Sequence, residues 1–318
     1  DVVLNLDDDD IDLILMTEPR KTSESSAFTH VDILKYISYV NSKTLVVHRI
    51  NECDERKNTN FVNQYLIEAN KVADATIFVS TWLKNLFFNQ GLFSEKNQVI
   101  LSGADKEIFN SESYSKWNNN SKLRIVTHHW GADWNKGFDI YRQLDEMIGT
   151  EKYKDKIEFT YIGNLPKKFK FNNSKVITPI SGKELSREIQ KNHVYLTASI
   201  NEPSGNHHIE GAQCGLPILF INSGGTPEYC NEFGVKFEKE NFEVKLDFFI
   251  ETYSQYVENM KNYPNNANLM CKKYEELFLS LFDNKEKIIE ERNIETRLNF
   301  FEKYPYTYSR KIKKYFKS

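Results

Sequence analysis

Cysteine is scarce in this chain, and its few cysteines are not paired in sequence. The 318 residues contain four cysteines, none of them in a CxxC spacing. Disulfide scaffolds belong to oxidising compartments and place their cysteines in recurring patterns. We therefore expect free thiols in a reducing compartment and predict a cytoplasmic protein. The four residues are Cys53, Cys214, Cys230 and Cys271.

Long apolar runs and a strong net charge are also absent. No segment approaches the length that spans a bilayer and no signal-peptide pattern opens the chain, so an integral membrane protein is not expected. The formal net charge of −3 gives no reason to expect a nucleic acid as partner. Only the C-terminal stretch YSRKIKKYFKS is locally basic and rich in aromatic residues. For this stretch we predict a terminal helix that packs back on the first domain, and peripheral contact with a membrane is the alternative.

Internal repeats and low-complexity segments are missing as well. What remains is a chain with 40% hydrophobic, 14% aromatic and 27% charged residues, a composition typical of soluble globular proteins. Its 318 residues exceed the usual size of one compact core. We therefore expect two domains with a cleft between them.

Short β-rich apolar runs alternate with helical patterns along most of the chain. The first series contains DLILM, a helix near residues 31–40, TLVVH, a helix in FVNQYLIEANKVA, and TIFVS. The second contains LRIVTHH, a helix in KGFDIYRQLDEMI, IEFTYIG, SKVITP, a helix in GKELSREIQ, VYLTA, a further helix, and LPILFIN. This alternation indicates βαβ units and parallel sheets.

We predict an α/β protein with two Rossmann-like, doubly wound domains that face each other across a cleft. The polar segment SESYSKWNNNSK has the composition of a linker, which places the first domain at residues 1–118 and the second at 119–284. After Val235 the chain is expected to turn helical. Residues 285–318 are predicted to form C-terminal helices that pack back on the first domain.

The stretch NEPSGNHHIEGAQCG follows the predicted strand VYLTA and opens a helix. In open parallel sheets, ligands bind outside the carboxyl ends of the strands. Gly205 lets the backbone come close to a ligand, and Asn206 can open a helix whose unpaired amides suit a phosphate. Helical spacing places Glu210 one turn after Asn206. The stretch is therefore a candidate diphosphate site.

Two carboxylates, Glu202 and Glu210, flank this candidate phosphate site. A carboxylate does not favour a diphosphate, but it accepts hydrogen bonds from neighbouring hydroxyls. Two such acceptors beside a diphosphate describe a nucleotide sugar, with the ribose at one carboxylate and the transferred sugar at the other. The alternative is structural: Glu202 as a surface turn residue, and Glu210 as a first-turn glutamate that the helix dipole favours.

Several motifs in order resemble the retaining GT-B glycosyltransferases of family 4 (glycosyl transferases group 1). The pair Glu202 and Glu210 forms an E-x7-E pattern, followed by GAQCGLP and SGGTPE. Further matches are VVH, ADATIFVS, VILSGADKEIF and KGFD, and the resemblance covers residues 11–228. It implies a GT-B fold and transfer of a sugar from a nucleotide-diphosphate sugar to an acceptor hydroxyl, with retained anomeric configuration and without a metal or other cofactor.

The resemblance also implies roles on the donor side. Lys136 matches the family lysine that meets the donor diphosphate, where its charge would stabilise the leaving group. The family arginine five residues earlier is Gly131 here. His128, His129 or backbone amides are then the candidates for the second phosphate contact. The expected donor-binding residues are Gly205, Asn206, His207, Glu210, Gly224, Gly225, Glu228 and His129, and Lys136, Glu202 and His48 are the expected catalytic residues.

On the acceptor side, His48 falls where the family has a histidine that faces the transferred sugar; a satisfied structural histidine is the alternative. Arg49, Asn51 and Arg56 lie in the polar loop that follows and are the candidate acceptor-binding residues, with solvated loop charges as the alternative. The acceptor is a glycan, a lipid-linked molecule or a protein.

Two alternatives stay open. The family's N-terminal Gly-rich loop has no counterpart in DVVLNLDDDD, so either residues before Asp1 supply it or the site lacks it. A nucleotide-sugar-binding protein without turnover is therefore one alternative. A metal-dependent hydrolase is the other, because His128-His129 and His207-His208 offer four imidazoles. Adjacent strand residues point to opposite faces, however, so the strand pair is expected to give one ligand at most.

Overall fold

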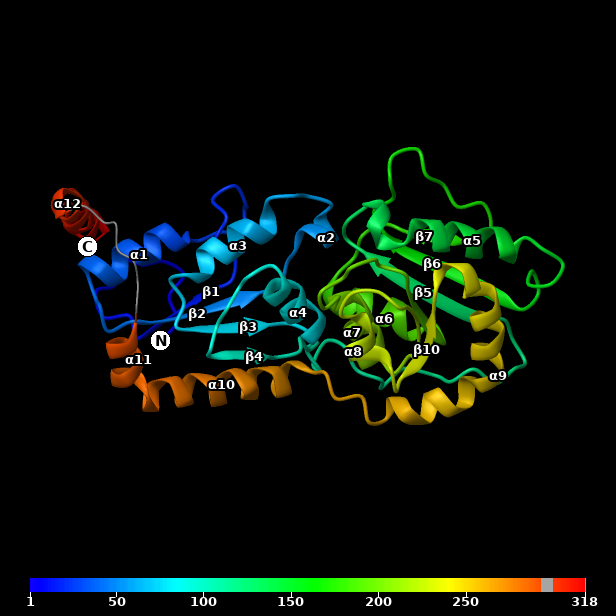
Figure 1. Cartoon of the computed structure of the whole chain (residues 1–318). Helices are drawn as coiled ribbons and strands as arrows, with labels where there is room; N and C mark the ends of the chain where they lie inside the picture. The colour runs from blue at the N-terminus through cyan, green and yellow to red at the C-terminus, as the bar shows by residue number, and fades with distance from the viewer. Residues whose placement is uncertain (293–299, 318) are drawn as a thin grey trace. The chain divides into compact units, whose positions relative to one another are not determined.

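The computed structural model describes residues 1–292 and 300–317 of the chain (Figure 1). It divides into two compact units. Unit 1 comprises Asp1–Val79, Leu83–Ile100 and Tyr274–Ser318, and unit 2 comprises Ser80–Trp82 and Leu101–Lys273. The domain limits at 118/119 and 284/285 stay predictions.

Unit 1 is built on a parallel sheet of four strands in the order β1-β2-β3-β4. The strands are β1 (Leu13–Met16), β2 (Leu45–Ile50), β3 (Ala75–Phe78) and β4 (Asn97–Val99). The helices between them are α1 (His30–Tyr39), α2 (Asp54–Lys57), α3 (Val62–Asn70) and α4 (Thr81–Asn89). The runs DLILM, TLVVH and TIFVS thus form β1, β2 and β3, as predicted.

Helix α1 illustrates why these residues form these elements. The Thr29 side chain accepts from the Asp32 backbone and the Asp32 carboxylate accepts from the Thr29 backbone, which is a capping box. Ile33, Tyr36 and Ile37 then share one face and are buried in the cluster that covers the sheet.

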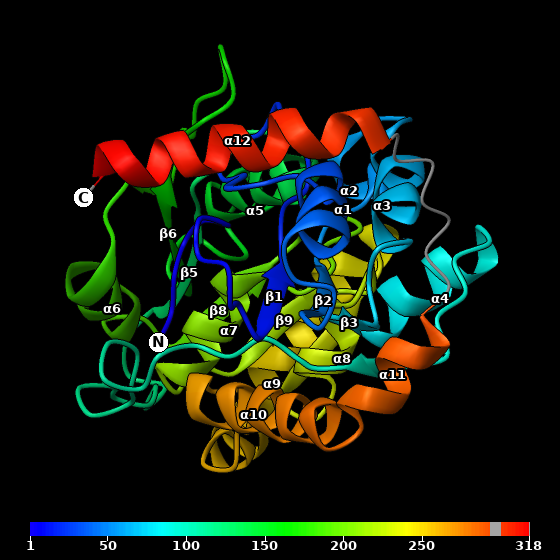
Figure 2. The ribbon, with the colours of Figure 1, turned by 90° about the vertical axis from the view of Figure 1, so that its left-hand side faces the viewer.

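The C-terminal helices of unit 1 are α10 (Ala267–Asp283, its part from Tyr274 onward), α11 (Lys285–Glu291) and α12 (Phe300–Lys317). Directly after α11, the Arg292 guanidinium donates to both carboxylate oxygens of Asp74 at 2.9 and 2.7 Å, and the pair is nearly buried. Helix α12 crosses α1, as Figures 1 and 2 show together, and Tyr306 packs against Tyr39. The Arg310 guanidinium donates to the backbone carbonyls of residues 6–8 and stacks over Tyr36. Arg292 and helix α12 therefore both contact the part of unit 1 between residues 6 and 74.

Unit 2 contains a parallel sheet of six strands in the order β10-β9-β8-β5-β6-β7. Its strands are β5 (Leu123–His129), β6 (Ile157–Gly163), β7 (Lys175–Ile177), β8 (Val194–Thr197), β9 (Ile218–Ile221) and β10 (Gly234–Phe237). Its helices are η1 (Trp134–Lys136), α5 (Phe138–Ile148), α6 (Gly182–Gln190), α7 (Asn206–Gln213), α8 (Thr226–Cys230), η2 (Lys239–Asn241) and α9 (Phe242–Met260). From β5 the chain builds outward to β7 and then returns to β8 on the other side, which is doubly wound topology.

The six-stranded sheet separates two hydrophobic clusters. One cluster joins Leu123 and Ile125 of β5 to residues of α5 and α9. The other joins Val126, the next residue of β5, to residues of α6 and α7. Successive strand residues point to opposite faces, so both faces of the sheet are covered.

Strand β10 is not among the predicted strands: Gly234–Phe237 forms it at the edge of the sheet. The helical part predicted after Val235 follows it, beginning with η2 and α9. The run GVKF has a glycine first and an exposed lysine inside, so it shows no apolar run of its own.

The four cysteines are free thiols, as predicted. Among residues 1–292 and 300–317, no helix has the length and apolar character needed to cross a membrane.

Candidate functional site

The predicted site residues of unit 2 meet at one edge of its sheet. Strands β5 and β8 are neighbours, and the strand order reverses between them. Ligands of open parallel sheets bind outside the carboxyl ends of strands at such a switch point. His128 and His129 end β5, while Glu202 and Gly205 follow β8. The topology therefore places both segments at the edge where a ligand is expected.

A tight turn brings Lys136 to Glu202. Gly137 has a φ of 94°, and a Cβ there would lie closer than 3.0 Å to the Ala198 backbone. The Ile200 backbone N–H donates to the Asn135 carbonyl at 2.7 Å. The segment after β5 is thus pressed against the end of β8. The Lys136 ammonium donates to Glu202 Oε2 at 2.8 Å, with side chains that are 15% and 6% exposed.

Gly205 links this ion pair to the start of helix α7. Its φ of 70° is left-handed, and a Cβ there would lie closer than 3.0 Å to the His208 ring and 3.0 Å from Glu202 Cγ. Asn206, the first residue of α7, is exposed. The first backbone N–H groups of a helix have no intrahelical partner and attract anions. Glu202 therefore lies between the Lys136 ammonium and the main chain that enters α7.

The second carboxylate of the site, Glu210, is bound by His128 at the end of β5. His128 Nε2 lies 2.8 Å from Glu210 Oε2, and His128 Nδ1 lies 2.9 Å from the Tyr195 hydroxyl. Ile209 and Ala212, on the other face of α7, are buried in the core. The Glu210 side chain remains 23% exposed.

The other imidazoles of this region are buried. His129 Nε2 lies 2.7 Å from the Tyr141 hydroxyl of α5, and the His129 ring also lies 4.5 Å from the His207 ring of α7. His128 binds Glu210 of α7. His207 Nε2 lies 2.8 Å from Thr197 Oγ1, and burial lowers its pKa well below the usual value. Burial also lowers the pKa of His208 to about 3. Both rings are therefore neutral near pH 7.

These imidazoles do not assemble into a metal site. In the part of the chain that the structure describes, no three or more His, Cys, Asp or Glu side chains could together hold a metal ion. Both nitrogens of His128 already have hydrogen-bond partners. The described residues therefore offer no set of metal ligands for the hydrolase alternative.

The glycines of SGGTPE pack against the Glu202 turn. A Cβ on Gly224 or Gly225 would lie closer than 3.0 Å to the backbone of residues 201–203, and the Gly225 N–H donates to the Glu202 carbonyl at 2.8 Å. The carboxylate of Glu228 accepts from the backbone N–H groups of Thr81 and Trp82, both at 2.8 Å. The two glycines thus help to shape the Glu202 turn, while Glu228 binds the backbone of residues 81 and 82.

His48 lies inside unit 1. Its Nδ1 donates to Asn70 Oδ1 at 2.8 Å, the same oxygen that accepts from Thr76 Oγ1 at 3.0 Å. The ring is fully buried, and burial lowers the pKa of His48 to about 4. Among the described residues, Nε2 has no hydrogen-bond partner. The contacts are those of a neutral structural histidine, and its catalytic role stays a prediction.

The acceptor-side residues lie nearby in sequence. Arg49 is half-buried in β2 and Asn51 is exposed directly after it. Arg56 donates to Glu52 Oε2 at 2.7 Å. Arg56 is thus engaged within its own loop, and the acceptor-binding role of all three residues stays a prediction.

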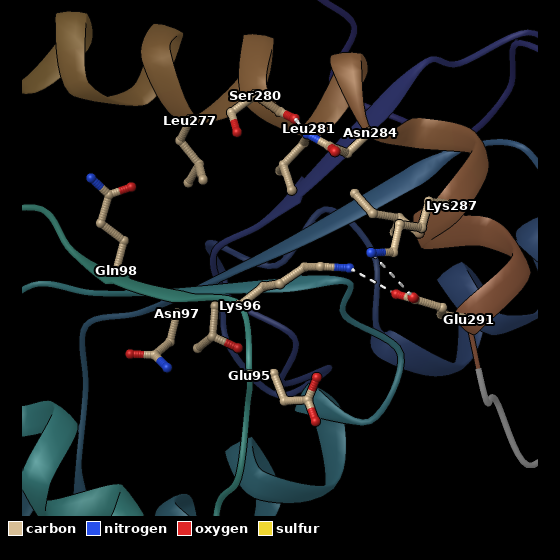
Figure 3. Close-up of a pocket in the computed structure, with 12 residues that line it drawn as sticks. Glu95, Lys96, Asn97, Gln98, Leu277, Ser280, Leu281, Asn284, Lys287 and Glu291 are labelled. Atoms are coloured by element: carbon tan, nitrogen blue, oxygen red, sulfur yellow. Dashed lines mark hydrogen bonds and ion pairs between the residues drawn. The ribbon is translucent and has the colours of Figure 1, made fainter.

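Two pockets lie away from the switch point. One in unit 1, of about 350 Å³, lies between β4 and helices α10 and α11, where Lys96 and Lys287 each point to the Glu291 carboxylate (Figure 3). The other, of about 770 Å³ in unit 2, is lined by residues of α8 and α9, among them Glu228. Glu228 is the only predicted site residue that lines either pocket.

The sequence prediction missed the partners that hold the candidate residues. Tyr195 and Tyr141 bind His128 and His129, and Asn70 binds His48. Each was read as part of an ordinary strand or helix, and only the folded chain brings it to its partner. No local pattern pointed to these three residues.

No protein-family model and no curated protein matches the chain. Solved structures do resemble it. A glycosyltransferase from Rickettsia africae superposes with a TM-score of 0.60 at 17% identity, covering 86% of this chain and 77% of that one. TarM from S. aureus gives a TM-score of 0.63 at 12% identity, with 84% of this chain covering 54% of TarM.

HepE from Anabaena, solved in complex with UDP-glucose, gives a TM-score of 0.62 at 12% identity over 85% of this chain and 78% of HepE. All three neighbours are glycosyltransferases of GT-B type. At these identities the likeness concerns the fold alone. With its two parallel α/β sheets, this chain has a GT-B fold, as predicted.

Proposed function

We propose that the protein is a glycosyltransferase that moves a sugar from a nucleotide-diphosphate sugar to an acceptor hydroxyl. One observation carries the proposal: the Lys136 ammonium, the Glu202 carboxylate and the backbone at Gly205 lie together at the switch point of a GT-B fold. That edge offers a cation and helix amides to a diphosphate and a carboxylate to a polyol.

In this proposal Lys136 serves two partners. A lysine ammonium has three donors, and Glu202 uses one of them at 2.8 Å. The others remain to meet the donor phosphates and stabilise the charge that grows on the leaving diphosphate. Glu202 accepts hydroxyls of the transferred sugar, and Glu210 accepts those of the ribose. Asn206, His207 and His129 belong to the same donor side.

The finer assignments follow the motifs. We assign the chain to family 4 with retention of configuration and without a metal or other cofactor, and we place it in the cytoplasm. The acceptor is a glycan, a lipid-linked molecule or a protein, met by Arg49, Asn51 and Arg56. HepE is described with UDP-glucose and a pneumococcal O-GlcNAc transferase with UDP and GlcNAc, so UDP-sugars are the first donors to test.

A protein that binds nucleotide sugars without turnover is the second candidate. It is favoured by Gly131, which stands where the family has an arginine, and by the ion pair that already neutralises Lys136. The two candidates share the binding site and differ in whether UDP is released from the donor.

Thermal denaturation with UDP-glucose and related UDP-sugars tests the shared site. Ligand at 100 times its Kd adds about 2.7 kcal/mol of stability, which raises Tm by about 5–10 °C at 2–4 °C per kcal/mol. We expect this rise in the wild type and its loss in Glu210→Ala. Glu184→Ala, which removes a glutamate from α6, should keep it.

Turnover then separates the candidates. Release of UDP in the presence of acceptor sugars, unaffected by EDTA, supports the transferase, and NMR of the glycoside shows whether configuration is retained. A ligand-induced rise in Tm without UDP release would establish the binding protein instead. No rise with any nucleotide sugar would contradict both.

We further propose that α12 contacts a membrane surface carrying anionic lipids. Tyr306 and Arg310 of α12 contact other residues of unit 1. Four further apolar or aromatic side chains of α12 recur at helical spacing and are exposed, namely Phe301 (79%), Tyr304 (66%), Tyr308 (68%) and Ile312 (41%). Residues 300–318 contain six Lys and Arg against one Glu. An exposed aromatic face on a basic helix is typical of binding at the bilayer interface.

Vesicle flotation tests this contact. We expect the wild type to float with vesicles of phosphatidylcholine and phosphatidylserine and not with phosphatidylcholine alone, because the basic residues require anionic lipid. Phe301→Ser/Tyr308→Ser should reduce flotation several-fold. Val244→Ser, which removes a similarly exposed apolar residue from α9, should not. Absence of wild-type flotation with both vesicle types would contradict the proposal.

A further inference from the structure

We infer that Tyr195 and His128 are positioning residues that hold Glu210 as a hydrogen-bond acceptor, with one oxygen bound to the protein and the other directed to ligand. The inference deepens the proposed function, and its reference to a ribose rests on that function. It adds Tyr195, which no motif indicates, and gives His128 a positioning role in place of the phosphate contact expected from the sequence.

The contacts form a continuous chain from the core to the surface. Tyr195 is fully buried in β8, His128 at the end of β5 is 8% exposed, and the Glu210 side chain is 23% exposed. The Tyr195 hydroxyl lies 2.9 Å from His128 Nδ1, and His128 Nε2 lies 2.8 Å from Glu210 Oε2. Three elements of unit 2 therefore fix one carboxylate.

The hydrogen bonds determine which way the protons point. The His128 backbone N–H donates to the Tyr195 oxygen at 3.1 Å, so the phenol proton is left for His128 Nδ1. Burial raises the pKa of Tyr195 well above its usual value, which keeps the phenol protonated. With Nδ1 as acceptor, a neutral imidazole carries its proton on Nε2. That proton is donated to Glu210 Oε2.

Close packing fixes the geometry. Gly211 follows Glu210 in α7, and a Cβ at Gly211 would lie closer than 3.0 Å to the Tyr195 ring. The backbone of α7 therefore rests on the ring whose hydroxyl holds His128. His128 and Tyr195 also pack edge to face, with ring centroids 5.7 Å apart. Rotation of the Glu210 side chain would break its hydrogen bond to His128, whose ring is itself held by Tyr195.

This arrangement predicts what the ligand must supply. Glu210 Oε2 is taken, and a carboxylate can only accept, so Oε1 selects a ligand group that donates. A nucleotide hydroxyl meets this requirement, whereas a deoxy position does not. A site built to bond a hydroxyl discriminates against the analogue that lacks it, because its polar group is left unpaired.

The test compares UDP with 2′,3′-dideoxy-UDP by calorimetry. We expect the wild type to bind UDP about tenfold tighter or better, a difference of about 1.4 kcal/mol. In His128→Leu and Tyr195→Phe this ratio should fall several-fold toward that of Glu210→Gln, with little change for the dideoxy compound. His128→Gln keeps an amide donor and should retain most of the ratio. A purely structural role would weaken both ligands equally and overturn the inference.

A second measurement is independent of any ligand. Imidazole ¹⁵N spectra, assigned with His128→Gln, should show the Nε2–H tautomer of His128, and Tyr195→Phe should disturb it. An Nδ1–H tautomer would overturn the inference. Failure of the wild type to bind UDP would instead contradict a uridine donor in the proposed function.

Discussion

Replacing Lys136 with methionine is expected to reduce sugar transfer about 10²- to 10³-fold, because removing one preorganised donor to a developing anion costs about that much. Methionine keeps the length and the apolar stem of lysine and loses only the charge and the N–H donors. The measurement is the initial rate of UDP release with acceptor present. Lys183→Met, at an exposed lysine near the start of α6, is the matched control and should keep full activity.

Stability must be separated from chemistry in this experiment. Methionine at position 136 leaves the Glu202 carboxylate, 6% exposed, without its cation. An unpaired buried polar group costs about 1–3 kcal/mol, so the single variant should also melt at lower temperature. The double variant Lys136→Met/Glu202→Gln removes the uncompensated charge. It should recover much of the Tm and none of the activity.

The rate of UDP release and the Tm together show which result would contradict a catalytic role for Lys136. If Lys136→Met keeps wild-type rates while its Tm falls, the ammonium serves only the ion pair with Glu202. If the double variant regains activity together with Tm, the loss in the single variant came from instability.

The alternation of apolar runs predicted most of both sheets because each strand carries its own local signal. LRIVTHH and IEFTYIG became β5 and β6 with their buried residues in place. Strand β10 escaped prediction because GVKF has a glycine and an exposed lysine and pairs only at the sheet edge. Its pairing with β9 is a long-range property that no local run contains.

The candidate site likewise contains residues that could be predicted together from the sequence and contacts that could not. Lys136, Glu202 and Gly205 could be predicted together because each follows a strand end, and parallel topology gathers strand ends at one edge. The partners of Glu210 and Glu228 could not. Glu228 binds backbone N–H groups 146 and 147 residues earlier in the chain, and such a contact exists only after folding.

Replacing Gly205 with alanine is expected to destabilise the protein by about 2–5 kcal/mol and to remove the Tm rise with UDP-sugars. The φ of 70° alone costs an alanine about 1–2 kcal/mol. The new Cβ would also overlap with the His208 ring, which is fully buried. Overpacking of this kind adds about 1–3 kcal/mol. Relief of the overlap must shift the turn that carries Glu202.

Gly182→Ala separates the two contributions. Gly182 opens α6 with a φ of 58°, and a Cβ there would meet nothing within 4 Å. This control therefore carries the backbone strain without the overlap, and its Tm should fall by roughly half as much while the UDP-glucose response persists. Urea denaturation and calorimetry measure both variants. Equal losses of stability in the two, with ligand binding retained in both, would show that the main chain at Gly205 does not shape the donor site.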